Sequence, residues 1–140
     1  MKDVIIKIKG TQGLEGTEEE VIELTTVGTL ETAQGEIVLC YDEGEMMGAK
    51  NLKTKLSVNV SDTVIMERSG EMSSRLVIEK GIRNSCFYST PYGELMIGIF
   101  GESIKNRLTE NGGELSMSYT LDQNLHPLSR NTVDISVKLA

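Results

Sequence analysis

Strict two-residue alternation of apolar and polar side chains is the feature that most constrains this chain. From Thr132 to Leu139 every second residue is apolar, and the segments Glu114–Asp122 and Leu52–Val60 repeat the pattern. Successive side chains of a β-strand point to opposite faces of its sheet, so the pattern indicates strands with one buried face. A helix with these spacings would spread its apolar residues around its whole surface. The alternation therefore predicts an antiparallel, all-β protein.

Turn-forming residues divide the sequence into about ten short strands joined mostly by hairpin-length links. Gly35, Ser61-Asp62, Gly70 and Asn111-Gly112 each stand at such a division. The expected strands are Val4–Lys9, Val21–Thr32, Glu36–Tyr41, Leu52–Val60, Thr63–Arg68, Arg75–Lys80, Ser85–Ser89, Glu94–Phe100, Glu114–Asp122 and Thr132–Leu139.

One segment, Glu102–Glu110, fits two structures. Ile104 and Leu108 are four residues apart, as on one side of a short helix, but they also alternate with polar residues as in a strand. We favour a strand that extends the preceding one, because Asn111-Gly112-Gly113 forms a plausible hairpin turn into the next.

The unpaired backbone groups at the edges of the sheet have to be protected, either in a sandwich or by closing the sheet into a barrel. The first and last segments are both good strands that could pair and close the sheet. Gly28, Gly98 and Gly101 lie inside strand patterns, where glycine often marks the bend or bulge that coils a sheet. We therefore predict one domain over residues 1–140, an up-and-down antiparallel β-barrel of about 8–10 strands, with a sandwich as the alternative.

Charge and hydropathy narrow the classes of partner and compartment. The chain has 14 Lys and Arg against 21 Asp and Glu, a net charge of −7, which disfavours a phosphate backbone as partner. No apolar run approaches a membrane helix, and the N-terminus alternates instead of forming a signal sequence. We expect a cytoplasmic protein that binds neither nucleic acid nor membrane, with Cys40 and Cys86 as free thiols.

The second half of the chain carries a series of turn and strand signatures that resembles a known family. The series consists of Arg68-Ser69-Gly70, Arg75 to Gly81, Tyr88 to Leu95, Ile104, Leu108, Gly112-Gly113 and Tyr119. It is similar to the YwiB-like family of uncharacterised bacterial proteins, which form calycin-like (lipocalin-like) β-barrels. The match covers most of the chain and is clearest from Val64 to Leu121. The resemblance implies the barrel and a cytoplasmic setting, but it brings no activity, because the family has none established.

No catalytic or metal-binding constellation stands out. Cys86 and His126 could act as nucleophile and base only if the fold brought them together, and neither lies in a nucleophile signature. The acidic groups Glu18–Glu20 and Asp42, Glu43 and Glu45 fit solvated charge better than a cation site. Met46-Met47 could cap a barrel mouth or meet a partner, although simple loop packing explains the pair better. We expect no cofactor and no metal, and an enzyme ranks last among three hypotheses.

Arg68 is the one residue that points to a site. In Thr63–Arg68 it shares a face with Val64 and Met66, while Ile65 and Glu67 share the other, so parity alone leaves the inward face open. If Val64 and Met66 point inward, Arg68 lies in the barrel or at its mouth. There its guanidinium would bind a ligand carboxylate or phosphate. The alternatives are a structural salt bridge to a barrel glutamate, or a strand-end arginine that reaches into water. Tyr88 and Tyr119 are the expected hydrogen-bonding companions.

Two functions are compatible with these residues. The leading hypothesis is a binding protein whose barrel takes a small, partly apolar and anionic molecule through Arg68, Tyr88 and Tyr119. The alternative is an interaction or structural barrel with a filled interior that binds another protein or forms a homodimer. Glu94–Phe100 supports the alternative, because it is apolar on both faces, with Leu95, Ile97 and Ile99 on one and Met96 and Phe100 on the other.

Overall fold

Ten β-strands make up the fold in the computed structural model. It describes residues 1–13, 18–46, 49–70, 73–90 and 93–140, with side chains throughout except at 43–46, 49–51 and 90. The strands are β1 (Lys2–Gly13), β2 (Glu20–Ala33), β3 (Glu36–Met46), β4 (Ala49–Val58), β5 (Val64–Ser69), β6 (Ser73–Ile78), β7 (Arg83–Thr90), β8 (Gly93–Thr109), β9 (Gly112–Gln123) and β10 (His126–Leu139). Within the described ranges there is no helix, and hence none that could cross a membrane.

The strands form one closed antiparallel sheet in up-and-down order. Closure is made by β1 and β10, which pair over ten residues from Val4 opposite Leu139 to Gly13 opposite Arg130. This pairing confirms the prediction that the first and last strands seal the barrel, and it excludes the sandwich. The segment Glu102–Glu110 is strand as far as Thr109, because it is the second half of β8, as the sequence favoured.

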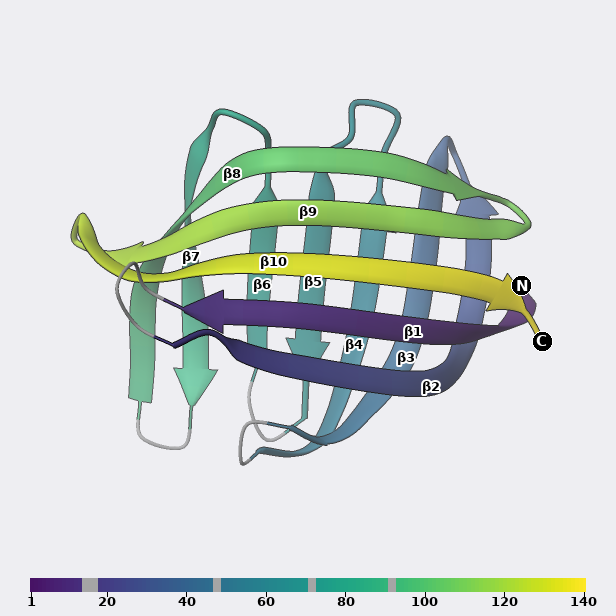
Figure 1. Cartoon of the computed structure of the whole chain (residues 1–140), viewed down its shortest axis with the longest axis horizontal. Coiled ribbons are helices and arrows are strands. Elements are labelled where there is room, and N and C mark those ends of the chain that lie inside the picture. Colours follow the sequence, from purple (N-terminus) through teal and green to yellow (C-terminus); the bar gives the residue numbers. More distant parts are fainter. Residues whose placement is uncertain (14–17, 47–48, 71–72, 91–92) are drawn as a thin grey trace.

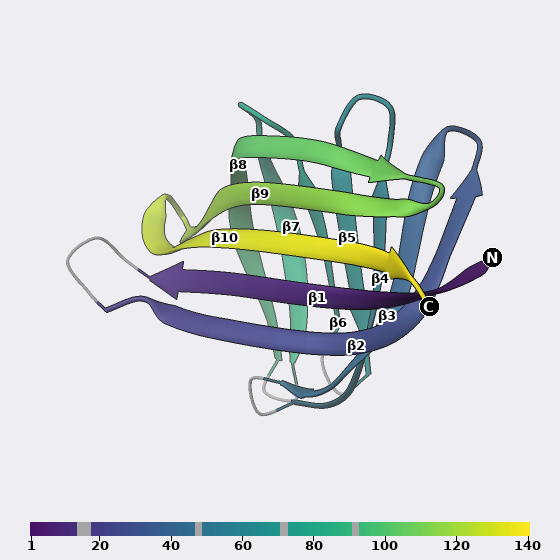
Figure 2. The same ribbon diagram turned by 45° about the vertical axis from the view of Figure 1, so that its right-hand side comes forward.

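The barrel is flattened into two crossing layers (Figure 1). β9, β10 and β1 run across one layer, and β3 to β7 run across the other. β2 and β8 bend and belong to both layers, as the turned view shows (Figure 2). β2 pairs with β1 along most of its length but with β3 only from Gly28 onward, and β8 passes from β7 to β9 over residues 98–100.

Glycines stand at both of these corners because the backbones approach too closely for a side chain. A Cβ added at Gly28 would collide with the carbonyl oxygen of Cys40, and one at Gly101 would collide with that of Glu79. The ladder between β8 and β9 also shifts register between Gly101 and Ser103. The glycines inside strand patterns therefore mark the bends of the sheet, as predicted from the sequence.

A third glycine, Gly98, lets an ion pair cross the corner at β8. Arg83 on β7 reaches over Gly98 to Asp122 on β9, with its Nη2 2.6 Å from Oδ1 and its Nε 3.0 Å from Oδ2. The hydrogen bonds from Arg83 hold the pKa of the Asp122 carboxyl below its ordinary value. The bidentate pair links the two layers where β8 passes from one to the other.

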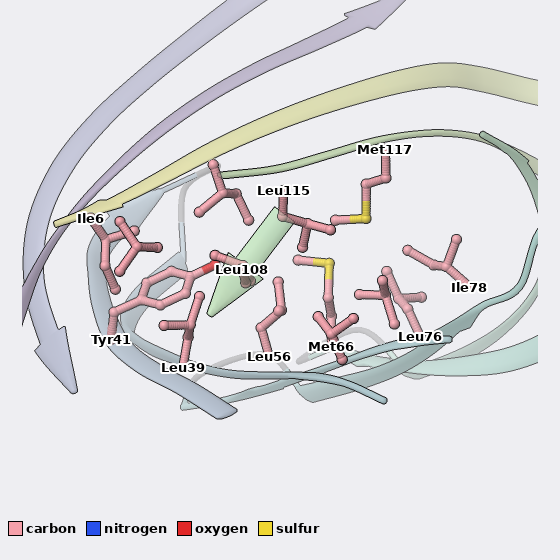
Figure 3. Packing of buried hydrophobic residues seen from close by; sticks show 14 of the residues in the cluster. Ile6, Leu39, Tyr41, Leu56, Met66, Leu76, Ile78, Leu108, Leu115 and Met117 are labelled. Atoms are coloured by element: carbon pink, nitrogen blue, oxygen red, sulfur yellow. The ribbon is translucent and has the colours of Figure 1, made fainter. Parts of the chain in front are cut away.

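Apolar side chains fill one end of the barrel in cross-strand rows. Opposed residues of a sheet share a face, so the register across β3, β4, β5 and β6 places Leu39, Leu56, Met66 and Leu76 side by side. The same register places Ile37, Val58, Val64 and Ile78 in the next row. Figure 3 shows Met66 and Met117 reaching toward one another from opposite walls, with Leu56 and Leu115 beside them. Nearly all of these side chains are fully buried, so this end is a packed core.

We predict that Gly101→Ala destabilises the protein by about 1–3 kcal/mol, because the new methyl group meets backbone that cannot move without disturbing the corner. Gly10→Ala is the matched control, since a Cβ there meets only the Thr132 carbonyl oxygen at 3.8 Å. It should keep or slightly raise stability, because alanine restricts the unfolded chain more than glycine does. Urea unfolding of both variants measures the difference, and equal midpoints would contradict the close approach at the corner.

Candidate functional site

The inward face changes from apolar to polar at one step along the strands of the back layer. Immediately beyond the Leu39–Leu56–Met66–Leu76 row, the register aligns Tyr41, Thr54, Arg68, Ser74 and Tyr88 across β3 to β7. Alternation keeps this polar row on the same inward face as the apolar rows. We call these five residues the back row.

The opposite layer carries a second polar row at the same end of the barrel. Gln12 on β1 stands opposite Asn131 on β10, which stands opposite Tyr119 on β9. Asn131 is buried, and its Nδ2 donates a hydrogen bond of 3.0 Å to the Ser129 Oγ. Tyr119 is also buried, at 6% exposure. We call Gln12, Asn131 and Tyr119 the front row.

The two rows border a cavity of about 170 Å³ at this end of the barrel. All of the front row lines it, together with Tyr41, Arg68, Ser74 and Tyr88 of the back row. Mostly apolar residues complete the wall, with two threonines among them, and Gly10 adds a position with no side chain. The remaining lining residues are Ile8, Gly10, Thr11, Ile22, Leu52, Met66, Leu121, Thr132 and Val133.

The cavity is lined by one cation, Arg68, and by three phenols, those of Tyr41, Tyr88 and Tyr119. Arg68 is half-buried, and among the described lining residues it alone is charged. Burial raises the pKa of Tyr88; the neighbouring Tyr119 raises it further, and the charge of Arg68 opposes the rise. Tyr88 therefore stays a neutral hydrogen-bond donor at physiological pH. The arrangement suits an acceptor group beside Arg68 and an apolar body against the remaining wall.

The structure brings the three residues singled out from the sequence to one cavity. Val64 and Met66 are buried, at 0% and 2% exposure, which settles the face of β5 that parity left open. Arg68 consequently points inward, and Tyr88 and Tyr119 line the same cavity from β7 and β9. Their role in binding a ligand stays a prediction.

The sequence patterns did not single out several lining residues, among them Gln12, Tyr41, Ser74 and Asn131. A usable signal was present, because each continues the apolar parity of its strand toward one end. Tyr41, for example, follows Ile37 and Leu39 at two-residue steps. A polar residue at the end of an apolar face marks a place where the core stops, although it does not say which other strands meet it there.

The remaining candidates do not join the site as a reactive group. Cys86 is buried, and its Sγ lies 3.3 Å from the carbonyl oxygen of Ile97, whereas His126 is exposed at the start of β10. One member of this pair is therefore buried and the other is exposed. The side chains of Glu43, Glu45 and Met46, and all of Met47, lie outside the described residues.

Comparisons with known proteins bear on the family and on the fold. The family model described as Domain of unknown function (DUF1934) matches residues 6–135. Among solved structures, the chain is similar to the ywiB protein from Bacillus subtilis, with a TM-score of 0.88 at 23% identity. That alignment covers 99% of this chain and 92% of the other. Among curated proteins, none matches. The relation to calycin-like barrels stays a prediction.

We predict that the two thiols differ sharply in reactivity. Cys40 is exposed, whereas Cys86 is buried and burial raises the pKa of its thiol, which lowers its thiolate fraction. Iodoacetamide should therefore alkylate Cys40 in the folded protein and Cys86 only after unfolding, as mass spectrometry of digested samples would show. Equal rates in the folded protein, or a disulfide between the two, would contradict the burial of Cys86.

Proposed function

The chain belongs to the family described as Domain of unknown function (DUF1934), and we propose that its barrel binds a small, partly apolar, anionic molecule in the cavity. The observation that carries the proposal is the position of Arg68, half-buried in a cavity whose other described lining residues are neutral. A guanidinium removed from water is stabilised by an anion far more than an exposed one is.

The neutral lining residues support binding rather than chemistry. Tyr88, Tyr119 and Ser74 line the cavity with hydroxyl groups and Asn131 with an amide, groups of the kind that hydrogen-bond an anion. Neither the arginine nor the phenols exchange protons readily near neutral pH. Such a set orients a ligand and does not transfer protons, so we propose a non-enzymatic role.

A reducing cytoplasm is the compartment in which we propose that the protein works. The family resemblance implies it, and the placement of the cysteines suits it. Cys40 is exposed and Cys86 is buried inside the barrel, and neither needs an oxidising compartment to keep the fold intact.

Arg68→Met tests the binding role, because methionine keeps much of the side-chain volume and removes the charge. We expect the wild-type melting temperature to rise with benzoate, decanoate, benzenesulfonate or phenyl phosphate, and this rise to disappear in the variant. The free energy of unfolding without ligand should stay level or increase, because a partly desolvated charge has been removed.

Arg107→Met is the matched control, since Arg107 is exposed on β8 and absent from the cavity wall. It should respond to the probes as the wild type does. A loss of about 3 kcal/mol in Arg68→Met, with no probe bound by the wild type, would instead identify Arg68 as part of a structural ion pair. That result would overturn the proposed function.

A second candidate function, self-association, is favoured by the outer face of β7 and β8. On the face of residues 94–100 that carries Leu95, Ile97 and Ile99, the two isoleucines are buried and Leu95 is 47% exposed. On the other face Met96 is 55% exposed. Met96 stands opposite Phe87, which is 57% exposed. Arg75 and Glu94 line the same outer groove as Phe87, so a copy related by a two-fold axis could present these opposite charges to each other.

Sedimentation velocity over a range of concentrations tests this candidate. We expect a dimer that Phe87→Ser weakens, because the substitution removes the most exposed aromatic side chain on the outer face of β7 and β8. Val60→Ser is the control, since Val60 is 86% exposed and belongs to neither β7 nor β8. A wild-type protein that stays monomeric throughout would exclude self-association through this face.

A further inference from the structure

The ladder between β6 and β7 is the shortest in the part of the sheet that the structure describes. These strands pair at two positions only, Ser73 opposite Ser89 and Ser74 opposite Tyr88. By comparison, β6 pairs with β5 over five residues, and β7 pairs with β8 over eight. The backbone that lies beyond the two pairs, which we call the seam, consists of residues 75–78 on β6 and 84–87 on β7.

One side chain bridges the seam in place of the missing ladder. Asn84 Nδ2 donates a hydrogen bond of 3.0 Å to the Val77 carbonyl oxygen and another of 3.2 Å to the Glu79 Oε1. Past the seam, the turn between the two strands is held to β8, because the Gly81 N–H donates to the Gly101 carbonyl oxygen at 2.8 Å. The seam is therefore anchored at both ends, while its middle depends on a single amide.

Backbone direction shows which amides face the seam. In an antiparallel strand, the N–H and C=O groups of successive residues point alternately to the two neighbouring strands. The Val77 carbonyl oxygen meets the Asn84 side chain of β7, so Val77 faces the seam and Leu76 faces β5. Continuing the register of the two existing pairs places Ser85 opposite Val77. Ser85 therefore faces the seam as well, and Cys86 faces β8.

The seam begins at the wall of the cavity. Ser74 and Tyr88 are the last paired residues, and both of them line the cavity. The next inward residues along the two strands are Leu76 and Cys86, which are buried at 1% and 5% exposure. Separating β6 from β7 at this point disturbs side-chain packing but breaks none of the described ladder pairs, so it costs fewer backbone hydrogen bonds than separating other neighbours.

Resting on the proposed function, we infer that the barrel wall opens along the seam and that the apolar part of the ligand extends from the cavity between Leu76 and Cys86. A gap between two strands is long and narrow, so this extension suits a chain better than a ring. The ligand class is then an anion with an alkyl chain, whose charged group stays in the cavity.

Native-state hydrogen exchange, followed by NMR on the full chain without ligand, tests the opening. We expect protection factors at least about tenfold lower for the amides of Val77 and Ser85 than for those of Leu76 and Cys86, because the seam amides lack a ladder hydrogen bond. The comparison is internal, since each pair of amides compares neighbours within β6 or β7. Equal protection of the two sets would overturn the opening.

Asn84→Ala tests whether the opening admits the ligand, because it removes both hydrogen bonds of the bridging amide. We expect decanoate to bind about threefold to tenfold more tightly by isothermal titration, since less of its binding energy is used to separate the strands. Benzoate has no chain to extend, so its affinity should stay the same. Protection at Val77 and Ser85 should fall further.

Asn106→Ala is the matched control, since Asn106 on β8 also forms two side-chain hydrogen bonds, with the Leu108 N–H and with Asp62. It should change neither decanoate binding nor exchange at the seam. Thermal unfolding of both variants confirms that they remain folded, and the exchange comparison in the wild type needs no variant.

The outcomes separate this inference from the proposed function. Decanoate that binds through Arg68, with its affinity unchanged in Asn84→Ala, would overturn the extension into the seam and leave the proposed function standing. If no probe binds in an Arg68-dependent manner, the proposed function fails, and the placement of a ligand in the seam fails with it.

Discussion

Cross-strand register around the closed sheet is the constraint on which the rest of this structure depends. The ten-residue pairing of β1 with β10 closes the barrel and fixes the strands relative to one another. Once the strands are fixed, inward residues line up in rows, and each row is apolar or polar along its length. The core and the cavity are successive rows of one sheet, so a slip of one strand would disrupt both.

The division between core and cavity follows from where the inward series of β3 to β6 reaches a polar residue, and on β4 the buried Leu52 follows that residue, Thr54, and lines the cavity. On β5 the inward series runs from Val64 through Met66 to Arg68. Neighbouring strands change at the matching position, which is why one arginine stands in a half-enclosed polar ring and not in an isolated buried place. The glycine corners at Gly28 and Gly101 fold this sheet over itself and bring the front row opposite the back row.

Much of the fold could be predicted because alternation is a local property. The strands, the closure and the glycine bends all followed from residue patterns a few positions long, and parity limited Arg68 to one of two faces. The rest of the site could not be predicted, since Gln12, Ser74 and Asn131 are separated by most of the chain and meet only through register. A single polar residue in a sequence does not show which residues of other strands will lie beside it.

The sequence by itself determined that this protein is a chain of antiparallel strands with one buried face each, because side-chain direction in a strand depends only on the parity of the position. It also determined the acidic surface charge and the positions where the sheet could bend. Only the tertiary structure decided which face of β5 is buried, that Arg68, Tyr88 and Tyr119 share a cavity, and that Gly10 leaves space there. These depend on which strands lie opposite one another across the barrel, and local alternation does not encode that arrangement.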